Sequence, residues 1–312
     1  MANQVYIDRC GEQVFRPPFS ATMTDYFGLA VRADHKALND NICKRYFNGP
    51  LREPDRFMAF QYVIFVFNNV DKARSLAYGY QDSGFFSYQE AAIWILIGDR
   101  KTERLRWFQP YIFVDDPVAM VTGREIYGFP KTIGSFAIPK GPTPPDRLWV
   151  RTRVVKEKNS EGSEQLLIEA RRRPESVAHC RGCGEADFMG RLLEILRVNP
   201  EYFQELGDVS HDMAENFYKD LMRMQLPLLF LREFRSAVNP AQAEGLLIQE
   251  AQSQIMEFYN AGIYEGGSYE LAINDVVSHP IRNDLGLDAG ILSVALAFYM
   301  SFSFKLDTCT RI

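Results

Sequence analysis

The sequence has few of the features that would place it outside the ordinary class of globular proteins. Only five cysteines occur in 312 residues, and their odd number argues against a framework of disulfides. No segment has the ~20 consecutive apolar residues of a membrane-spanning helix. The most apolar window, residues 290–304, is shorter and is interrupted by serines. Neither sign of charge dominates, because the net charge is −5 and the isoelectric point is about 5.6. We therefore expect a protein that binds neither nucleic acid nor membrane.

The first residues of the chain also lack a targeting signal. A secretory signal peptide begins with basic residues and continues into an apolar run, and residues 1–19 show neither. We therefore predict a cytoplasmic protein.

Two of the cysteines, Cys180 and Cys183, lie close together in the sequence "HCRGC". With His179 they would supply at most part of a structural zinc site, which usually has four ligands. No second CxxC or HxxxH pair accompanies them. We predict reduced thiols in a loop and no metal, and keep a metal or redox role as the alternative.

The secondary-structure pattern is mainly β. Val-, Ile- and aromatic-rich runs bounded by turn residues predict strands at 61–70, 87–99 and 106–116. Residues 146–173 predict a hairpin with its turn at "NSEGSE", and the segments after residue 225 also have strand character. Apolar spacing predicts helices at 187–197 and 211–224, and Asp34 is expected to cap a short helix after the first strand.

Strands that are not joined by regular helical crossovers argue against a doubly wound parallel sheet. We therefore predict an α+β, mainly β fold with a large curved antiparallel sheet, or β-barrel-like core, and flanking helices. No linker divides the chain, so we predict a single domain over residues 1–312, with insertions near 70–84 and 175–215.

The stretch "GREIYGFPKT", residues 123–132, holds the main candidate for chemistry. Pro130 fixes its own φ and Gly128 can adopt backbone angles that other residues resist, so the turn aims Lys131 in a fixed direction. Tyr127 and Phe129 are available to wall off the amine. Lost hydration disfavours the charged form of a lysine, and a neutral amine can attack a carbonyl to form a Schiff base. A solvated lysine in a turn is the alternative.

A second candidate is Glu90, which lies 41 residues before Lys131 at the head of an apolar strand. A carboxylate is costly to bury unless it is paired. It could act as a general acid and base, or as the partner of a cation; a solvated strand end is the alternative.

Residues 115–134, "DDPVAMVTGREIYGFPKTIG", resemble the signature of the acetoacetate decarboxylase superfamily, in which Gly-Arg-Glu precedes an aromatic turn and Pro-Lys. The stretches "DYFGLAVRADHKAL", "SYQEAAIWI" and "AGIYEGGSYELAINDVVSHPIRNDLGL" resemble other family segments in the same order. The resemblance covers roughly residues 25–305. It implies a barrel-like core, no cofactor and a homo-oligomer.

The resemblance also implies roles for individual residues. Lys131 would be the Schiff-base lysine and Glu90 the pocket glutamate that assists proton transfer. The other residues given roles are Tyr127, Phe129, Tyr264 and Glu265 as pocket lining, and Arg124 and Glu125 as braces of the motif.

Three positions depart from the family pattern. Thr132 stands where the decarboxylase has a second lysine, which leaves lost hydration to favour the neutral amine. Thr24 and Asp25 stand where an arginine is expected near the substrate carboxylate, and Arg16 or Arg32 could replace it. A second pocket glutamate is replaced by Gln61 or Tyr62.

Three functions remain open from the sequence. The first is a cofactor-independent lyase that forms an imine between Lys131 and a keto acid and decarboxylates a β-keto acid. The second keeps the imine but is an aldolase-dehydratase or cyclase acting on a larger keto acid. The third is a binding protein for an apolar ligand.

Overall fold

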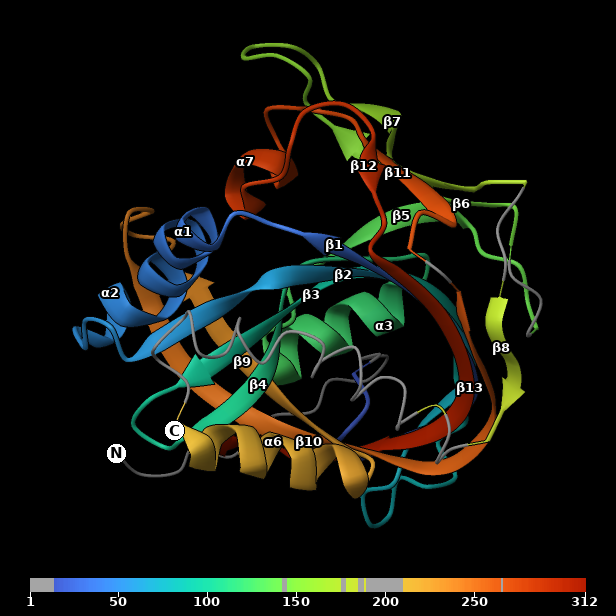
Figure 1. Ribbon diagram of the computed structural model, residues 1–312. Helices are drawn as coiled ribbons and strands as arrows, with labels where there is room; N and C mark the ends of the chain where they lie inside the picture. The colour runs from blue at the N-terminus through green and yellow to red at the C-terminus, as the bar shows by residue number, and fades with distance from the viewer. Residues whose placement is uncertain (1–13, 142–144, 175–177, 185–187, 189–209, 265) are drawn as a thin grey trace.

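The computed structural model describes residues 14–141, 145–174, 178–184, 188, 210–264 and 266–312. Strands dominate this part of the chain and helices are few, which confirms the prediction of a mainly β fold (Figure 1). The strands are β1 (Phe19–Arg32), β2 (Phe57–Ser75), β3 (Phe86–Asp99), β4 (Arg104–Val114), β5 (Lys131–Ala137), β6 (Arg147–Val154), β7 (Ser163–Arg172), β8 (Ala178–Cys183), β9 (Gln225–Arg235), β10 (Ala243–Tyr264), β11 (Tyr269–Ile273), β12 (Leu292–Ser293), β13 (Leu296–Leu306) and β14 (Thr310–Arg311). The helices are α1 (His35–Leu38), α2 (Gly49–Leu51), α3 (Pro117–Thr122), α6 (His211–Met222) and α7 (Ile281–Leu285), with π-helical segments η1 (Asn39–Asn48) and η2 (Gly123–Tyr127).

The long strands close into a ring. Neighbouring strands pair in the order β4-β3-β2-β1-β13-β10-β9, and β9 returns to β4 through the bridge between Trp107 and Leu228. Closure leaves none of these strands with a free edge along its whole length. The predicted barrel-like core is therefore present in the described part of the chain.

A second group of strands extends the sheet from β4. It runs through β5, β6, β7 and β11 to β12, and it lies above the ring in Figure 1. The sheet is not wholly antiparallel as predicted, because β4 pairs in parallel with both β5 and β9. The short helical segment 117–127 turns the chain between β4 and β5, which lets the two strands run in the same direction.

The two faces of the ring strands contribute side chains to different apolar clusters. On β3 the odd-numbered residues Ala91, Ile93, Ile95 and Ile97 belong to the largest apolar cluster of the protein. The even-numbered residues of the same strand face the other way, because successive side chains of a strand alternate. This second face lies inside the ring, where the smaller apolar clusters are found.

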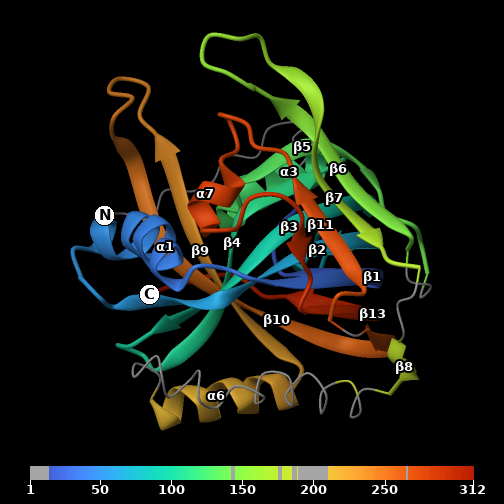
Figure 2. The same ribbon diagram turned by 45° about the horizontal axis from the view of Figure 1, so that its top comes forward.

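Different helices cover the two faces of the ring strands. Side chains of α1, η1 and α7 join the large cluster on the odd face. Segment α3–η2 lies within the curve of the sheet in Figure 1 and packs on residues from β3 and β4. Figure 2 shows α6 across the opposite end, beneath β10.

Several local predictions are confirmed. The Asp34 carboxylate accepts a hydrogen bond from the Ala37 backbone N–H at 2.6 Å, so it caps α1 as expected. The hairpin forms from β6 and β7, and residues 211–222 form α6. No helix in the described residues is long and apolar enough to cross a membrane.

Other predictions differ from the structure or lie outside it. Cys180 and Cys183 lie on β8, paired with β10, and not in a loop. A CxxC spacing says nothing of backbone conformation, and the long edge of β10 supplies the partner for this short strand. The helix predicted at 187–197, except for Phe188, and most of the insertion predicted at 175–215 fall outside the described residues.

Candidate active site

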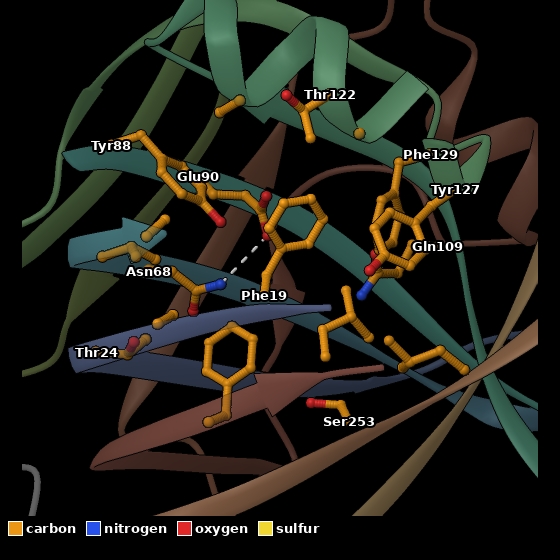
Figure 3. Close-up of a pocket in the computed structure, with 18 of the residues that line it drawn as sticks. Phe19, Thr24, Asn68, Tyr88, Glu90, Gln109, Thr122, Tyr127, Phe129 and Ser253 are labelled. Carbon is orange, nitrogen blue, oxygen red and sulfur yellow. Dashed lines mark hydrogen bonds between the residues drawn. The ribbon is translucent and has the colours of Figure 1, made fainter. Parts of the chain in front are cut away.

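A cavity of about 120 Å³ lies inside the ring, between α3–η2 and the even face of the sheet. Figure 3 shows side chains from β1, β2, β3, β10 and η2 converging on it. Most of the wall is apolar or aromatic. Of the described residues that line it, Lys131 is the only cation and Glu90 the only anion. An apolar cavity with a few convergent polar groups is typical of a small-molecule site.

Lys131 reaches the cavity from the first position of β5. Gly128 ends η2 with φ of 83°, and an added Cβ would lie 2.5 Å from the Cα of Arg232 on β9. Gly123 is needed for a different reason, since a Cβ there would lie 2.7 Å from Cδ of Lys131. The glycines of the motif thus let the turn and the lysine pack closely.

The Lys131 amine forms an ion pair with Glu90. Its Nζ lies 2.8 Å from Oε2 of the carboxylate, and the two side chains are only 7% and 11% exposed. The amine also lies 5.0 Å from the ring centre of Tyr88 and 5.4 Å from that of Phe129. The ion pair therefore replaces much of the hydration that burial removes.

Asn68 engages the second oxygen of Glu90. Its side-chain amide donates to Oε1 at 3.4 Å, as the dashed line in Figure 3 marks. The two residues are directly opposite each other in the pairing of β2 with β3. The carboxylate is therefore oriented by one neighbour at each oxygen.

Two tyrosines beside the carboxylate are held in their protonated form. Burial, and then the charge of Glu90, raise the pKa of Tyr26 and of Tyr88 well above that of an ordinary phenol. Both hydroxyls remain hydrogen-bond donors at neutral pH. Together with the cavity-lining Gln109, Thr24 and Ser253 they give the site neutral polar groups.

The comparisons with known proteins give one family match and a set of structural neighbours. Residues 65–166, which include both Glu90 and Lys131, match the family model of acetoacetate decarboxylase. Over this segment the chain is similar in sequence to the acetoacetate decarboxylase family. No curated protein matches the sequence.

Several solved structures share the fold over all or nearly all of the chain. Acetoacetate decarboxylase from Legionella pneumophila superposes with a TM-score of 0.61 at 14% identity, covering 100% of this chain and 92% of that one. An acetoacetate decarboxylase-like enzyme from Sphingomonas wittichii RW1 gives 0.57 at 13% identity, covering 100% and 99%. The enduracididine biosynthesis enzyme MppR complexed with pyruvate gives 0.58 at 15% identity, covering 96% and 92%.

The structure brings only some of the predicted site residues together. The rings of Tyr127 and Phe129 line the cavity with Lys131 and Glu90. The Tyr127 hydroxyl points away from it, because it donates to the Asp307 carbonyl at 3.0 Å. Tyr127 thus offers an apolar surface to a ligand.

The two residues expected to brace the motif lie on η2. Arg124 donates from Nη1 to the backbone carbonyl of Lys131 at 3.0 Å, which ties the helical segment to the start of β5. Neither Arg124 nor Glu125 lines the cavity.

Tyr264 does not lie where it was expected. It is buried in the large cluster on the odd face, with its ring 6.3 Å from that of Tyr299, and it does not line the cavity. A strand position on the opposite face of the sheet cannot be told from sequence unless the register is known. Glu265 lies outside the described residues.

The structure also locates the residues that depart from the family pattern. Gln61 and Tyr62 do not line the cavity, and Asn68 is the β2 residue that faces Glu90. Neither Arg16 nor Arg32 lines it. The Thr132 hydroxyl donates to the Ile112 carbonyl at 3.5 Å. Within the described residues, nothing takes the place of the second lysine or the arginine.

The polar neighbours of Glu90 were missed from the sequence, and only the pairing of β2 with β3 could have revealed Asn68. The described residues contain no group of three or more His, Cys, Asp or Glu side chains that could hold a metal ion.

Proposed function

We propose that this protein is a cofactor-independent lyase in which Lys131 forms a Schiff base with the ketone of a keto acid and Glu90 moves the protons. The proposal rests on the 2.8 Å contact between the Lys131 amine and the Glu90 carboxylate inside an apolar cavity. Amine nucleophiles need an adjacent group that accepts their proton, and Glu90 is within reach to do so.

The steps follow from these positions. Glu90 takes a proton from the Lys131 ammonium, and the neutral Nζ attacks the ketone carbon to give a carbinolamine. Glu90 returns a proton to the departing hydroxyl, which leaves as water, and a protonated imine remains. The positive imine nitrogen is then the electron sink, so no further cofactor is required.

For a β-keto acid the next step is loss of CO₂. The bond to the carboxylate carbon breaks, and its electron pair moves through the adjacent bond to the imine nitrogen, which gives an enamine. No cation other than Lys131 lines the cavity in the described residues, so the carboxylate would be poorly solvated there. Departure as neutral CO₂ relieves this cost. Protonation of the enamine carbon and hydrolysis by water release the ketone and restore the amine.

A second candidate keeps the imine but forms a carbon–carbon bond. One structure of MppR, which shares this fold, holds the condensation product of pyruvate and imidazole 4-carboxaldehyde. In this alternative the enamine attacks an aldehyde, and water is lost afterwards. The protein would then be an aldolase-dehydratase or cyclase for a larger keto acid.

Borohydride trapping tests the proposal. The protein is mixed with acetoacetate, with pyruvate, or with pyruvate plus an aldehyde, and then reduced and measured by intact mass and peptide mapping. We expect a stable adduct on Lys131, CO₂ from the β-keto acid, and no adduct in Lys131→Ala. Lys140→Ala is the matched control, because Lys140 also pairs with a carboxylate at 2.8 Å but its side chain is 70% exposed.

The outcomes separate the candidates. CO₂ release at the native rate by Lys131→Ala would disprove the imine mechanism. A condensation product without CO₂ would favour the aldolase-dehydratase. Absence of an adduct with every ketone would leave the protein as a binder of apolar ligands. For Glu90→Gln we expect turnover to fall by about 10²–10⁴-fold, the usual contribution of a general acid–base group.

A further inference from the structure

A second cavity of about 100 Å³ is lined in part by the inner face of α6. Its wall is almost wholly apolar or aromatic. It contains no Asp, Glu, Lys or Arg from the described residues. The residues that line this cavity and not the first include Trp107, Phe217 and Leu221.

The two cavities are adjacent along the same face of the sheet. They share four lining residues, Tyr26, Trp94, Leu226 and Phe302. The Tyr26 ring lies 6.2 Å from that of Trp94 and 5.9 Å from that of Phe302, so these rings form the layer between the cavities. Aromatic side chains at a shared wall can be displaced by rotation about χ angles without moving the strands.

The path from the amine to this layer has a defined length. Glu90, the partner of Lys131, lies four residues before Trp94 on β3. Because a strand rises 3.2–3.4 Å per residue, the two residues are about 13 Å apart along the strand. An extended chain advances about 1.2 Å per bond, so roughly ten to eleven bonds cover the distance. A longer chain would enter the second cavity.

Helix α6 forms one wall of that cavity and is held in place at both ends. Ser210 caps it by accepting from the Met213 N–H at 3.1 Å, and Arg104 holds Asp220 at 2.9 Å. Phe217 and Leu221, one turn apart on the inner face, line the cavity. Met222 points outward and is 54% exposed.

We propose that the substrate carries a long unbranched apolar tail, with its ketone at Lys131 and its tail running past Tyr26 and Trp94 into the second cavity. The head-group assignment rests on the proposed Schiff-base function, while the tail assignment rests on the cavities alone. Burying a methylene makes binding about fourfold tighter, so affinity should rise with chain length beyond the point where the first cavity is filled.

The test uses straight-chain methyl ketones, from butanone to tetradecanone, which are the products expected from β-keto acids. Binding is followed by the fluorescence of tryptophan, since Trp94 and Trp107 both line the second cavity. We expect affinity to keep rising from decanone to tetradecanone, by on the order of a hundredfold. A plateau at or before decanone in the native protein would overturn the proposal.

A variant that fills the second cavity locates the tail. In Leu221→Phe we expect butanone to bind as in the native protein, and tetradecanone to bind no better than decanone. Met222→Phe, the matched control on the outer face of α6, should keep the full rise. An unchanged rise in a folded Leu221→Phe would also overturn the proposal. If Leu221→Phe does not fold, the native series alone decides.

Failure of the tail proposal is distinguishable from failure of the Schiff base. Fluorescence reports binding whether or not an imine forms, whereas borohydride trapping reports the imine alone. If short ketones are trapped on Lys131 but affinity reaches a plateau at decanone, the tail proposal fails and the Schiff-base function stands. A continued rise in affinity without any trapped adduct would support the tail proposal and contradict the Schiff-base function.

Discussion

Replacing one member of the Lys131–Glu90 ion pair should destabilise the protein more than replacing both. At 2.8 Å the attraction between unit charges is about 6 kcal/mol with an effective dielectric constant of ~20. Most of this offsets the desolvation of two side chains that are no more than 11% exposed. Lys131→Met or Glu90→Gln alone leaves a buried charge without its partner. We therefore expect each single change to lower the free energy of unfolding by about 3–5 kcal/mol.

The double variant Lys131→Met/Glu90→Gln removes both charges, so its loss should be smaller than the sum of the two single losses by at least ~2 kcal/mol. Urea unfolding followed by tryptophan fluorescence gives the four free energies of the cycle. Lys140 and Asp71 provide the control, because their N–O distance is also 2.8 Å but both side chains are exposed. That pair should show no measurable coupling. Additive losses at Lys131 and Glu90 would refute the reasoning, since they would mean that the pair is solvated like a surface pair.

Two other perturbations test the same site. Gly123→Ala places a Cβ 2.7 Å from Cδ of Lys131, so we expect kcat/KM and the rate of borohydride trapping to fall by about a hundredfold in a folded protein. Gly245→Ala, where no atom lies within 4 Å of the added Cβ, should have native activity, and equal activity of the two variants would exclude this steric role. Alkaline pH should unfold the protein, because an unfolded tyrosine loses its proton near pH 10 while Tyr26 and Tyr88 keep theirs. The free energy of unfolding is then unchanged below pH 10 and falls as pH rises above it, by up to ~1.4 kcal/mol per pH unit for each phenol. The urea midpoint should therefore decrease less steeply between pH 10 and 11 in Tyr26→Phe than in the native protein.

The elements of the fold were largely predictable because their signals are local. The apolar runs of β2, β3 and β4, the cap at Asp34 and the amphipathic α6 each follow from a few neighbouring residues. A barrel-like core was predictable, but the strand order and the pair of strands that closes it were not. The parallel contacts of β4 with β5 and β9 depend on where separate segments meet, and no local pattern encodes that.

The chemical pair was predictable for two different reasons. Lys131 follows a turn whose Gly and Pro residues have direct backbone meaning, and Glu90 is a costly charge in an apolar strand. Their contact at 2.8 Å needs strands β3 and β5 to be placed relative to one another, with β4 between them. The resemblance to a known family supplied that placement.

The errors came from strand register. Between β2 and β3 the pairing shifts twice, near Ala59 and near Val70, so counting along the sequence does not tell which β2 residue faces Glu90. Asn68 was missed for this reason, whereas Gln61 and Tyr62 were named from the family pattern and do not line the cavity. The same uncertainty put Tyr264 in the cavity, although its strand turns that side chain to the other face.

The alternation along β3 separates what keeps the protein folded from what meets a ligand. Ala91, Ile93, Ile95 and Ile97 build the main core, whereas the even positions Tyr88, Glu90 and Trp94 form the cavity wall. A change at an even position therefore alters the ligand's surroundings while the core one residue away keeps its packing. A library confined to Tyr88 and Trp94, with Glu90 and its ion pair kept, would therefore vary the ligand's surroundings and leave the main core unchanged.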